Sequence, residues 1–206
     1  MHPGADIADV VASGYEQNLA LRAPTTDEAV AVEAWSVVAS ADPAVRVEAV
    51  KLADDRSGDT LVARIEGAGH SLAARAIVRD ERDAIAAQLR AWCADPGIDA
   101  VISTGGTGLT GRDVTVEAHR DVYEKEIDAF GTVFTWVSMQ KIGTSSVQSR
   151  ACAGVAQGTY LFALPGSPGA CRDAWDEILA LQFDYRHRPC NFVEIFPRLD
   201  EHLRRK

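Results

Sequence analysis

Two short apolar segments, each followed by a glycine-containing turn, constrain the fold of this chain more than any other feature. Residues 98–103 and 159–164 are apolar along most of their length, which is typical of strands buried on both faces of a parallel sheet. Each turn leads into residues with a helical pattern. Because the order strand, turn, helix recurs, the sequence predicts an α/β domain with a mostly parallel sheet and helices on both faces.

The spacing of apolar residues and the positions of capping and breaking residues predict the other elements. Further strands are expected at residues 45–52 and 70–79. Helices are expected at residues 55–68, 84–92, 114–123, 129–139, 147–155 and 169–181. Residues 7–21 also show near-helical spacing and are compatible with a helix.

The composition of the chain changes near residue 45. Residues 1–44 are rich in alanine and acidic side chains, so we interpret them as an N-terminal extension that packs on the main domain, residues 45–206. The first strand of that domain has two interpretations. Residues 45–52 alternate apolar and polar side chains and are slightly favoured on that ground, whereas a strand at residues 35–42 would be followed by an insertion.

The charge of the chain limits its partners. The net charge of −9 argues against a general nucleic-acid-binding protein, which usually presents a basic surface. A phosphate-bearing small ligand remains compatible with this charge, because backbone N–H groups at the start of a helix bind phosphate without net positive charge.

Cysteine usage and hydropathy indicate the compartment. The four cysteines lie far apart and form no CxxC pair, so neither a zinc-binding nor a redox motif is supported, and buried free thiols are expected. The sequence contains neither an apolar run long enough to span a membrane nor a secretory signal pattern. We therefore expect a cytoplasmic protein without a membrane partner.

Residues 103–118 (STGGTGLTGRDVTVEA) carry the strongest chemical signal. The segment leaves a predicted strand and enters a helix, and ligands of open α/β sheets bind at that end of the strands. Three glycines within four residues let the backbone approach a ligand and turn its N–H groups inward, as phosphate-binding turns do. Arg112 can neutralise a phosphate, and Asp113 can hold Mg²⁺ or orient a nucleophile. Without a ligand, the same residues would form a tight turn in which Asp113 caps the next helix.

A second turn, residues 164–170 (LPGSPGA), also joins a strand to a helix and is expected at the same edge of the sheet. Its Ser167 can donate to a phosphate or a ring oxygen. Asp80, directly after the strand expected at residues 70–79, either adds a second carboxylate or caps the following helix. The hydroxyl-rich residues 141–150 suit an anionic ligand or the capping of a helix equally well.

At these residues the chain resembles the MoaB/MogA family of molybdenum-cofactor biosynthesis proteins. The matching segments are residues 104–108, 112–115, 117–118, 142–145, 149–151, 153–155 and 164–169. Residues 188–192 (RPCNF) resemble the MoaB branch in particular, and the resemblance covers residues 54–196. It implies a three-layer α/β/α domain, a homotrimer or hexamer, and a molybdate-insertion protein as the partner that receives the product.

The activity that this resemblance implies is transfer of AMP from Mg-ATP to the terminal phosphate of molybdopterin, with release of pyrophosphate. By position in the family motifs, Asp113 would be the essential carboxylate and the Mg²⁺ ligand, and Asp80 a second catalytic carboxylate. The substrate-binding residues implied are Gly105, Gly106, Thr107, Gly108, Arg112, Thr115, Glu117, Ser145, Pro165, Gly166, Ser167, Pro168 and Gly169. Adenylyl transfer mainly needs positioning, a metal ion and donors directed at developing charge, and these residue types can supply them.

The chain departs from the family pattern near its first strand. Residues 54–58 (DDRSG) match the family, but no clear strand ending in a Thr-Val-Ser-Asp-Thr-like segment precedes them. One wall of the nucleotide site would then be altered. The alternative function is a non-catalytic molybdopterin-binding or scaffolding protein of the same pathway, although the presence of Arg112 and Asp113 favours the enzyme.

Overall fold

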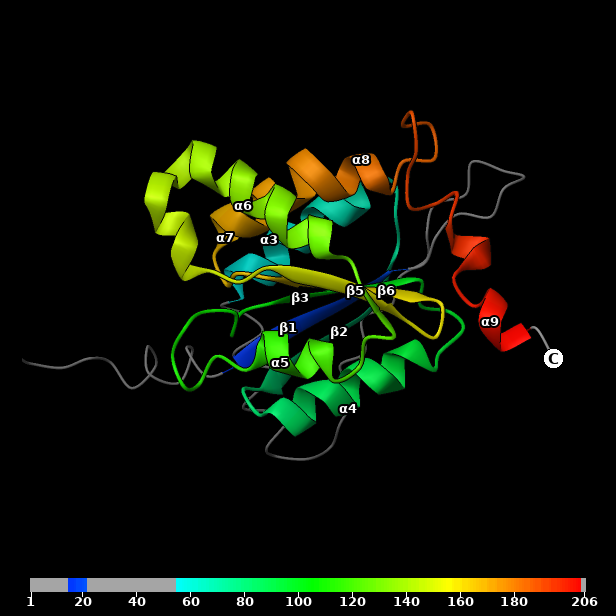
Figure 1. The fold of residues 1–206 in the computed structure, drawn as a ribbon, viewed down its shortest axis with the longest axis horizontal. Coiled ribbons are helices and arrows are strands. Elements are labelled where there is room, and N and C mark those ends of the chain that lie inside the picture. Colours follow the sequence, from blue (N-terminus) through cyan, green and yellow to red (C-terminus); the bar gives the residue numbers. More distant parts are fainter. Residues whose placement is uncertain (1–14, 22–54, 205–206) are drawn as a thin grey trace, which may run out of the picture.

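A computed structural model of the chain describes residues 15–21 and 55–204, which form a sheet between two groups of helices (Figure 1). The strands are β1 (Tyr15–Leu21), β2 (Leu72–Arg79), β3 (Ala100–Thr104), β4 (Lys125–Glu126), β5 (Cys152–Ala156) and β6 (Thr159–Leu164). The α-helices are α3 (Arg56–Gly67), α4 (Arg82–Cys93), α5 (Thr115–Arg120), α6 (Asp128–Ile142), α7 (Pro168–Ala174), α8 (Ala180–Gln182) and α9 (Glu201–Arg204). Short 3₁₀ segments are η1 (Gly143–Gln148) and η3 (Phe196–Arg198), and a π-helical segment, η2 (Trp175–Leu179), joins α7 to α8.

The six described strands form one mixed sheet in the order β2-β1-β3-β6-β5-β4. Strands β2, β3, β6 and β4 share one direction, while β1 and β5 run against them. Among the described pairs, only β3 and β6 are therefore hydrogen-bonded in parallel, with Thr104 opposite Leu164. This register brings the ends of both strands, and the turns that follow them, to the same edge of the sheet.

Helices cover both faces of the sheet, which confirms the predicted three-layer α/β fold. Helices α3, α6 and α7 lie on one face and α4 and α5 on the other (Figure 1). Side chains of β3 point alternately to the two sides, so Ala100 and Ile102 enter the core under α3, α6 and α7, whereas Val101 enters the core under α4 and α5. Burial of both faces explains the continuous apolar character of this strand.

Helix α3 starts where its capping residue was predicted. The buried carboxylate of Asp55 accepts a hydrogen bond of 2.7 Å from the backbone N–H of Gly58, which satisfies a donor at the helix start. The same carboxylate pairs with Arg75 of β2 at 2.5 Å. One side chain therefore both caps α3 and attaches it to the sheet.

The helix predicted at residues 147–155 is wrong. Residues 152–156 instead form β5, whose five residues are all buried and pair antiparallel with β6. Gln157 and Gly158 close this hairpin with φ values of 51° and 87°, a conformation typical of two-residue hairpin turns. A short buried apolar run has no clear periodicity, and pairing with a neighbouring strand decided its structure.

The helical pattern at residues 7–21 also misleads, because residues 15–21 form β1. The backbone of this strand pairs with β2 on one side and with β3 on the other. Local spacing is a weak signal that such pairing on both sides can override. The alternative first strands at residues 35–42 and 45–52, and the proposed domain boundary, lie outside the described residues.

Free thiols are buried at three of the four cysteine positions, as expected for Cys93, Cys152 and Cys171, whereas Cys190 is exposed. In the part of the chain that the structure describes, every helix is too short or too polar to cross a membrane.

Gly154 tests the packing of the sheet against the segment after α5. A Cβ atom at this position would overlap the ring of Tyr123, whose hydroxyl is in contact with His119 and Cys152. We expect Gly154→Ala to lower the free energy of unfolding by about 2 kcal/mol or more, measured by urea denaturation. Gly67→Ala is the matched control, because a Cβ there meets no atom within 4 Å. Equal stabilities of the two variants would contradict this packing.

Candidate functional site

The two glycine turns lie against each other at the edge of the sheet where β3 and β6 end. The N–H of Gly105 donates to the carbonyl of Leu164 at 3.0 Å, and the hydroxyl of Thr104 donates to the carbonyl of Pro165 at 3.0 Å. A Cβ added to Gly166 would lie only 3.0 Å from the Cα of Gly105. The turns therefore touch backbone to backbone, and the sequence placed them correctly at one edge.

Asp80 lies beside the first turn. Its Oδ1 atom is buried and has no hydrogen-bond partner among the described residues, and a Cβ added to Gly106 would lie 3.2 Å from it. The alternative role as a helix cap is not observed: Glu81, not Asp80, occupies the N-cap position of α4, and it makes no side-chain capping bond. Burial raises the pKa of Asp80, the charge of Arg112 lowers it, and the charge of Asp113 raises it again.

Asp113 faces back onto its own turn. Its Oδ2 accepts hydrogen bonds from the N–H and the hydroxyl of Thr110, at 2.8 and 2.6 Å. Burial acts to raise the pKa of Asp113, but hydrogen bonds from Thr110 and from the backbone of Gly108 outweigh it and leave the pKa below its usual value. The carboxylate therefore stays ionised, and it does not cap α5 through Thr115 or Val116.

The turn needs glycine where its backbone passes close to other groups. Gly106 has a φ of 58°, and a Cβ there would overlap the hydroxyl of Thr115. A Cβ on Gly108 would lie 2.7 Å from a carboxylate oxygen of Asp113. Thr115 is buried and donates to the carbonyl of Gly105 at 2.8 Å, so in this structure its hydroxyl holds the turn.

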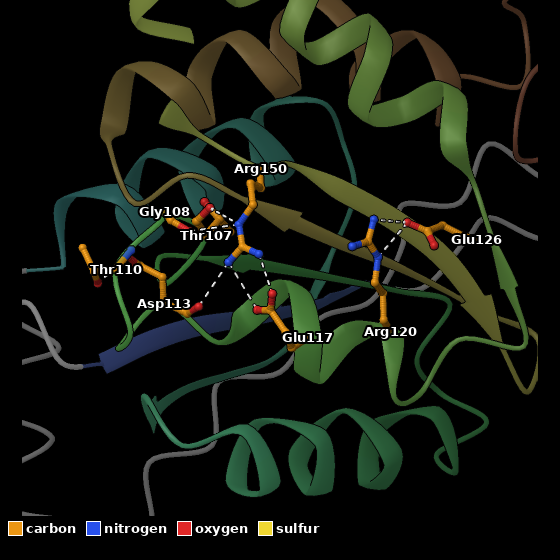
Figure 2. Close-up of polar contacts among 8 residues, drawn as sticks. All are labelled: Thr107, Gly108, Thr110, Asp113, Glu117, Arg120, Glu126 and Arg150. Carbon is orange, nitrogen blue, oxygen red and sulfur yellow. Dashed lines mark hydrogen bonds and ion pairs between the residues drawn. The ribbon is translucent and has the colours of Figure 1, made fainter. Parts of the chain in front are cut away.

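Arg150 fastens the first turn from the side of β5, as Figure 2 shows. Its Nε donates to the carbonyls of Gly108 at 2.9 Å and Thr107 at 3.3 Å. Its Nη2 donates to the carbonyl of Asp113 at 3.1 Å, and the guanidinium pairs with the carboxylate of Glu117. This pairing is the main cause that lowers the pKa of Glu117. We call these contacts the Arg150 clamp.

The other residues implied as substrate contacts take different places. Ser167 caps α7, because its hydroxyl accepts from the N–H of Ala170 at 3.1 Å, and Pro168 is the first residue of that helix. Ser145 lies exposed in η1. Arg112 is exposed, and it acts on Asp80 through its charge. Arg112 therefore lies next to the converging turns, and its guanidinium is open to solvent.

A pocket of about 440 Å³ opens next to the clamp, between the start of α6 and the start of β5. Arg150 borders both this pocket and the first turn. On the far side, Arg120 pairs with Glu126 at 2.8 Å (Figure 2). The pocket is further lined by Thr132, Ser149 and Cys152, among others. The pocket could not be predicted from the sequence, because its lining residues come from α5, β4, α6 and β5 and form no local motif.

Two carboxylates, rather than a dense cluster, are available to a cation. Within residues 15–21 and 55–204, no group of three or more His, Cys, Asp or Glu side chains is arranged to hold a metal ion. The unpartnered oxygen of Asp80 and the ionised Asp113 nevertheless flank the first turn. Such a pair fits Mg²⁺, which usually takes only one or two carboxylates and completes its shell with water and substrate phosphates.

An α/β domain with two glycine turns converging at one edge of its sheet defines a small-ligand-binding protein. The family described as "Probable molybdopterin binding domain" matches residues 40–184, and the chain belongs to this family of molybdenum-cofactor biosynthesis proteins.

Relatives and solved structures support this assignment. The chain is 50% identical over 139 residues to molybdenum cofactor biosynthesis protein B of Escherichia coli K12, covering 68% of this chain and 82% of that protein. The protein of the same name from Bacillus subtilis 168 is 43% identical over 126 residues, which cover 61% of this chain and 74% of that protein.

Solved structures show the same fold. A crystal structure of a molybdenum cofactor biosynthesis protein B covers 88% of this chain and 100% of that chain, with 27% identity and a TM-score of 0.61. The match to the tungsten cofactor synthesizing protein MoaB from Pyrococcus furiosus covers 62% of this chain and 80% of that chain, with 31% identity and a TM-score of 0.52.

The Arg150 clamp can be tested by a substitution that keeps the charge. Arg150→Lys loses the planar fork that reaches three carbonyls and Glu117, so we expect the free energy of unfolding to fall by about 1–3 kcal/mol. Arg120→Lys alters the exposed pair with Glu126 and should cost less than about 1 kcal/mol. Urea denaturation of both variants measures the difference, and equal losses would argue against the clamp.

Proposed function

We propose that this protein transfers AMP from Mg-ATP to the terminal phosphate of molybdopterin and releases pyrophosphate. Membership of the family supports molybdopterin as a ligand. The observation that carries the proposal is the buried oxygen of Asp80 beside Gly106, which has no partner in residues 15–21 and 55–204, with the ionised Asp113 on the adjoining turn. A buried carboxylate oxygen without a partner is costly, and a cation bound with the substrate would satisfy it.

The phosphates would lie over the converging turns. Gly106 and Gly108 allow close approach there, whereas the N–H of Gly105 is already bonded to Leu164. Arg112, exposed beside Asp80, would add positive charge next to the phosphates.

The pocket beside Arg150 has room for the pterin ring. Its lining of hydroxyls and paired charges, among them Thr132 and Ser149, suits a flat heterocycle with many hydrogen-bonding groups. The remaining residues implied as contacts, Pro165 to Gly169 and Ser145, would border the ligand from the second turn and from η1.

The reaction requires little proton transfer by the protein. A terminal phosphate oxygen of molybdopterin is already anionic, and it bonds to the α-phosphorus of ATP as the bond from that phosphorus to the bridging oxygen breaks. Bound Mg²⁺ would neutralise charge on the phosphates, held by Asp80 and Asp113. The contribution of the chain is to hold the two anionic groups in line and to place Arg112 near the developing charge.

Asp113 tests the catalytic proposal. We expect Asp113→Asn to lower formation of adenylylated molybdopterin at least roughly 100-fold, because a carboxylate that holds the cation is lost. Asp80→Asn should act in the same way, and removal of Mg²⁺ with EDTA should stop the reaction. Asp121→Asn is the matched control, since Asp121 pairs with Arg82 on the exposed surface.

The product is measured by chromatography after incubation of the purified protein with molybdopterin, ATP and Mg²⁺. No product from the parent protein, with molybdopterin still bound, would overturn the enzymatic proposal. It would leave the non-catalytic molybdopterin-binding or scaffolding role.

We further propose that the chain forms a homotrimer or hexamer, as its family resemblance implies, and that a molybdate-insertion protein receives its product. Helix α6 exposes Val133, Trp136 and Met139, spaced three residues apart, and Trp136 is 65% exposed. Such a stripe on one side of a helix is typical of a covered interface.

Trp136 tests the assembly. Trp136→Glu places a charge in the exposed stripe of α6, so we expect it to yield a smaller species than the parent in sedimentation velocity. Ala87→Glu, which adds the same charge at an exposed position of α4 on the other face of the sheet (Figure 1), should leave the assembly unchanged. A monomeric parent would contradict the oligomer.

A further inference from the structure

Three polar side chains on the α5 side of the sheet are spaced four residues apart. Thr115, His119 and Tyr123 follow one another at helical spacing, and each bonds to a strand or to its neighbour. We call them the polar stripe. Thr115 bonds to the carbonyl of Gly105, and the Nε2 of His119 lies 2.8 Å from the hydroxyl of Ser103.

The spacing of the stripe matches that of β3. Four residues of a helix rise about 6 Å, and two residues of a strand span about 6.6 Å. Thr115 and His119 are four residues apart on α5, while their partners Gly105 and Ser103 are two residues apart at the end of β3. The helix is therefore bonded at two levels, once to β3 and once to the residue directly after it, which defines both its position along the strand and its rotation.

His119 occupies a place that an apolar side chain could fill. The ring is fully buried, and burial lowers its pKa to about 3, so it is neutral at physiological pH. Its Nδ1 lies 3.1 Å from the hydroxyl of Tyr123, which in turn lies 3.4 Å from the sulfur of Cys152. Apolar packing would also stabilise the contact between α5 and the sheet, but it is not directional, whereas hydrogen bonds fix the distance and angle between their partners.

We propose that His119 is a positioning residue: its bond to Ser103 sets the register of α5 on β3 and thereby the place of Asp113 relative to Asp80. This inference rests on the proposed adenylyl transfer. The turn between β3 and α5 contains no helix or strand; Arg150 and the bonds from Thr110 to Asp113 hold its course, and the place of α5 sets where its far end lies. Without this bond, α5 would be held by Thr115 and by the pair of Glu117 with Arg150, and neither contact involves a residue of β3.

Hydrogen exchange followed by mass spectrometry tests the positioning without any assay of activity. We expect His119→Leu and Ser103→Ala, which each remove the same bond, to speed amide exchange in residues 104–115 roughly tenfold. Exchange in β6 should stay at the parent rate. His119→Gln, whose side-chain amide can still reach Ser103, should restore much of the protection.

The outcomes separate positioning from simple stabilisation. Unchanged exchange in residues 104–115, or an equal rise in β6 and in the turn, would overturn the inference. Tyr123→Phe keeps the bond between His119 and Ser103. Its amide exchange in residues 104–115 should therefore stay closer to the parent rate than that of Ser103→Ala. If His119→Leu does not fold, Ser103→Ala still tests the bond.

Kinetics then connect the turn to the reaction. We expect Ser103→Ala to lower kcat for adenylyl transfer several-fold while KM for ATP changes less, because a misplaced Asp113 weakens stabilisation of the transition state more than binding of the substrate. If the parent forms no product, the adenylyl transfer fails, yet the exchange data still decide whether His119 positions the turn. Normal turnover by a variant whose turn exchanges faster would contradict its role in the reaction.

Discussion

The parallel pairing of β3 with β6 is the constraint on which the site depends. Because Thr104 lies opposite Leu164, the two strands end at one level, and the turns after them meet through the bond from Gly105 to Leu164. An offset of a single residue would point the side chains to opposite faces and separate the turns. The neighbouring strands β1 and β5 run the other way, so this pair brings the two glycine turns together in one place.

The polar groups of the site divide into those that build it and those left for a ligand. Arg150 and Thr115 bond to backbone carbonyls of the first turn, and Ser167 caps α7. Asp80 and Arg112 keep atoms available at the edge of the sheet. Backbone carbonyls in a glycine-rich turn lack the partners that helices and strands provide, so side chains from distant segments must satisfy them.

Local pattern predicted those elements whose period or turn residues are clear. Residues 159–164 form a strand with the predicted bounds, and the glycine turns lie at one edge as expected. The helical patterns at residues 147–155 and 7–21 were misleading. Short segments with weak periodicity take the structure that pairing with neighbouring strands imposes. The role of Arg150 could not be predicted from the sequence, since its partners lie about forty residues away along the chain. The pocket beside it could not be predicted either, because its lining residues come from separate elements.

The sequence by itself determined the class of fold, the two glycine turns and the family, because these depend on residue order and on motifs within a few positions. Only the tertiary structure decided that Glu117 belongs to the Arg150 clamp, that Thr115 is buried, and that an oxygen of Asp80 lacks a partner among the described residues. The physical reason is that a polar side chain bonds to whichever group the fold brings within about 3 Å. Residue type states what a side chain can do, and its neighbours in space determine which of those roles remains open.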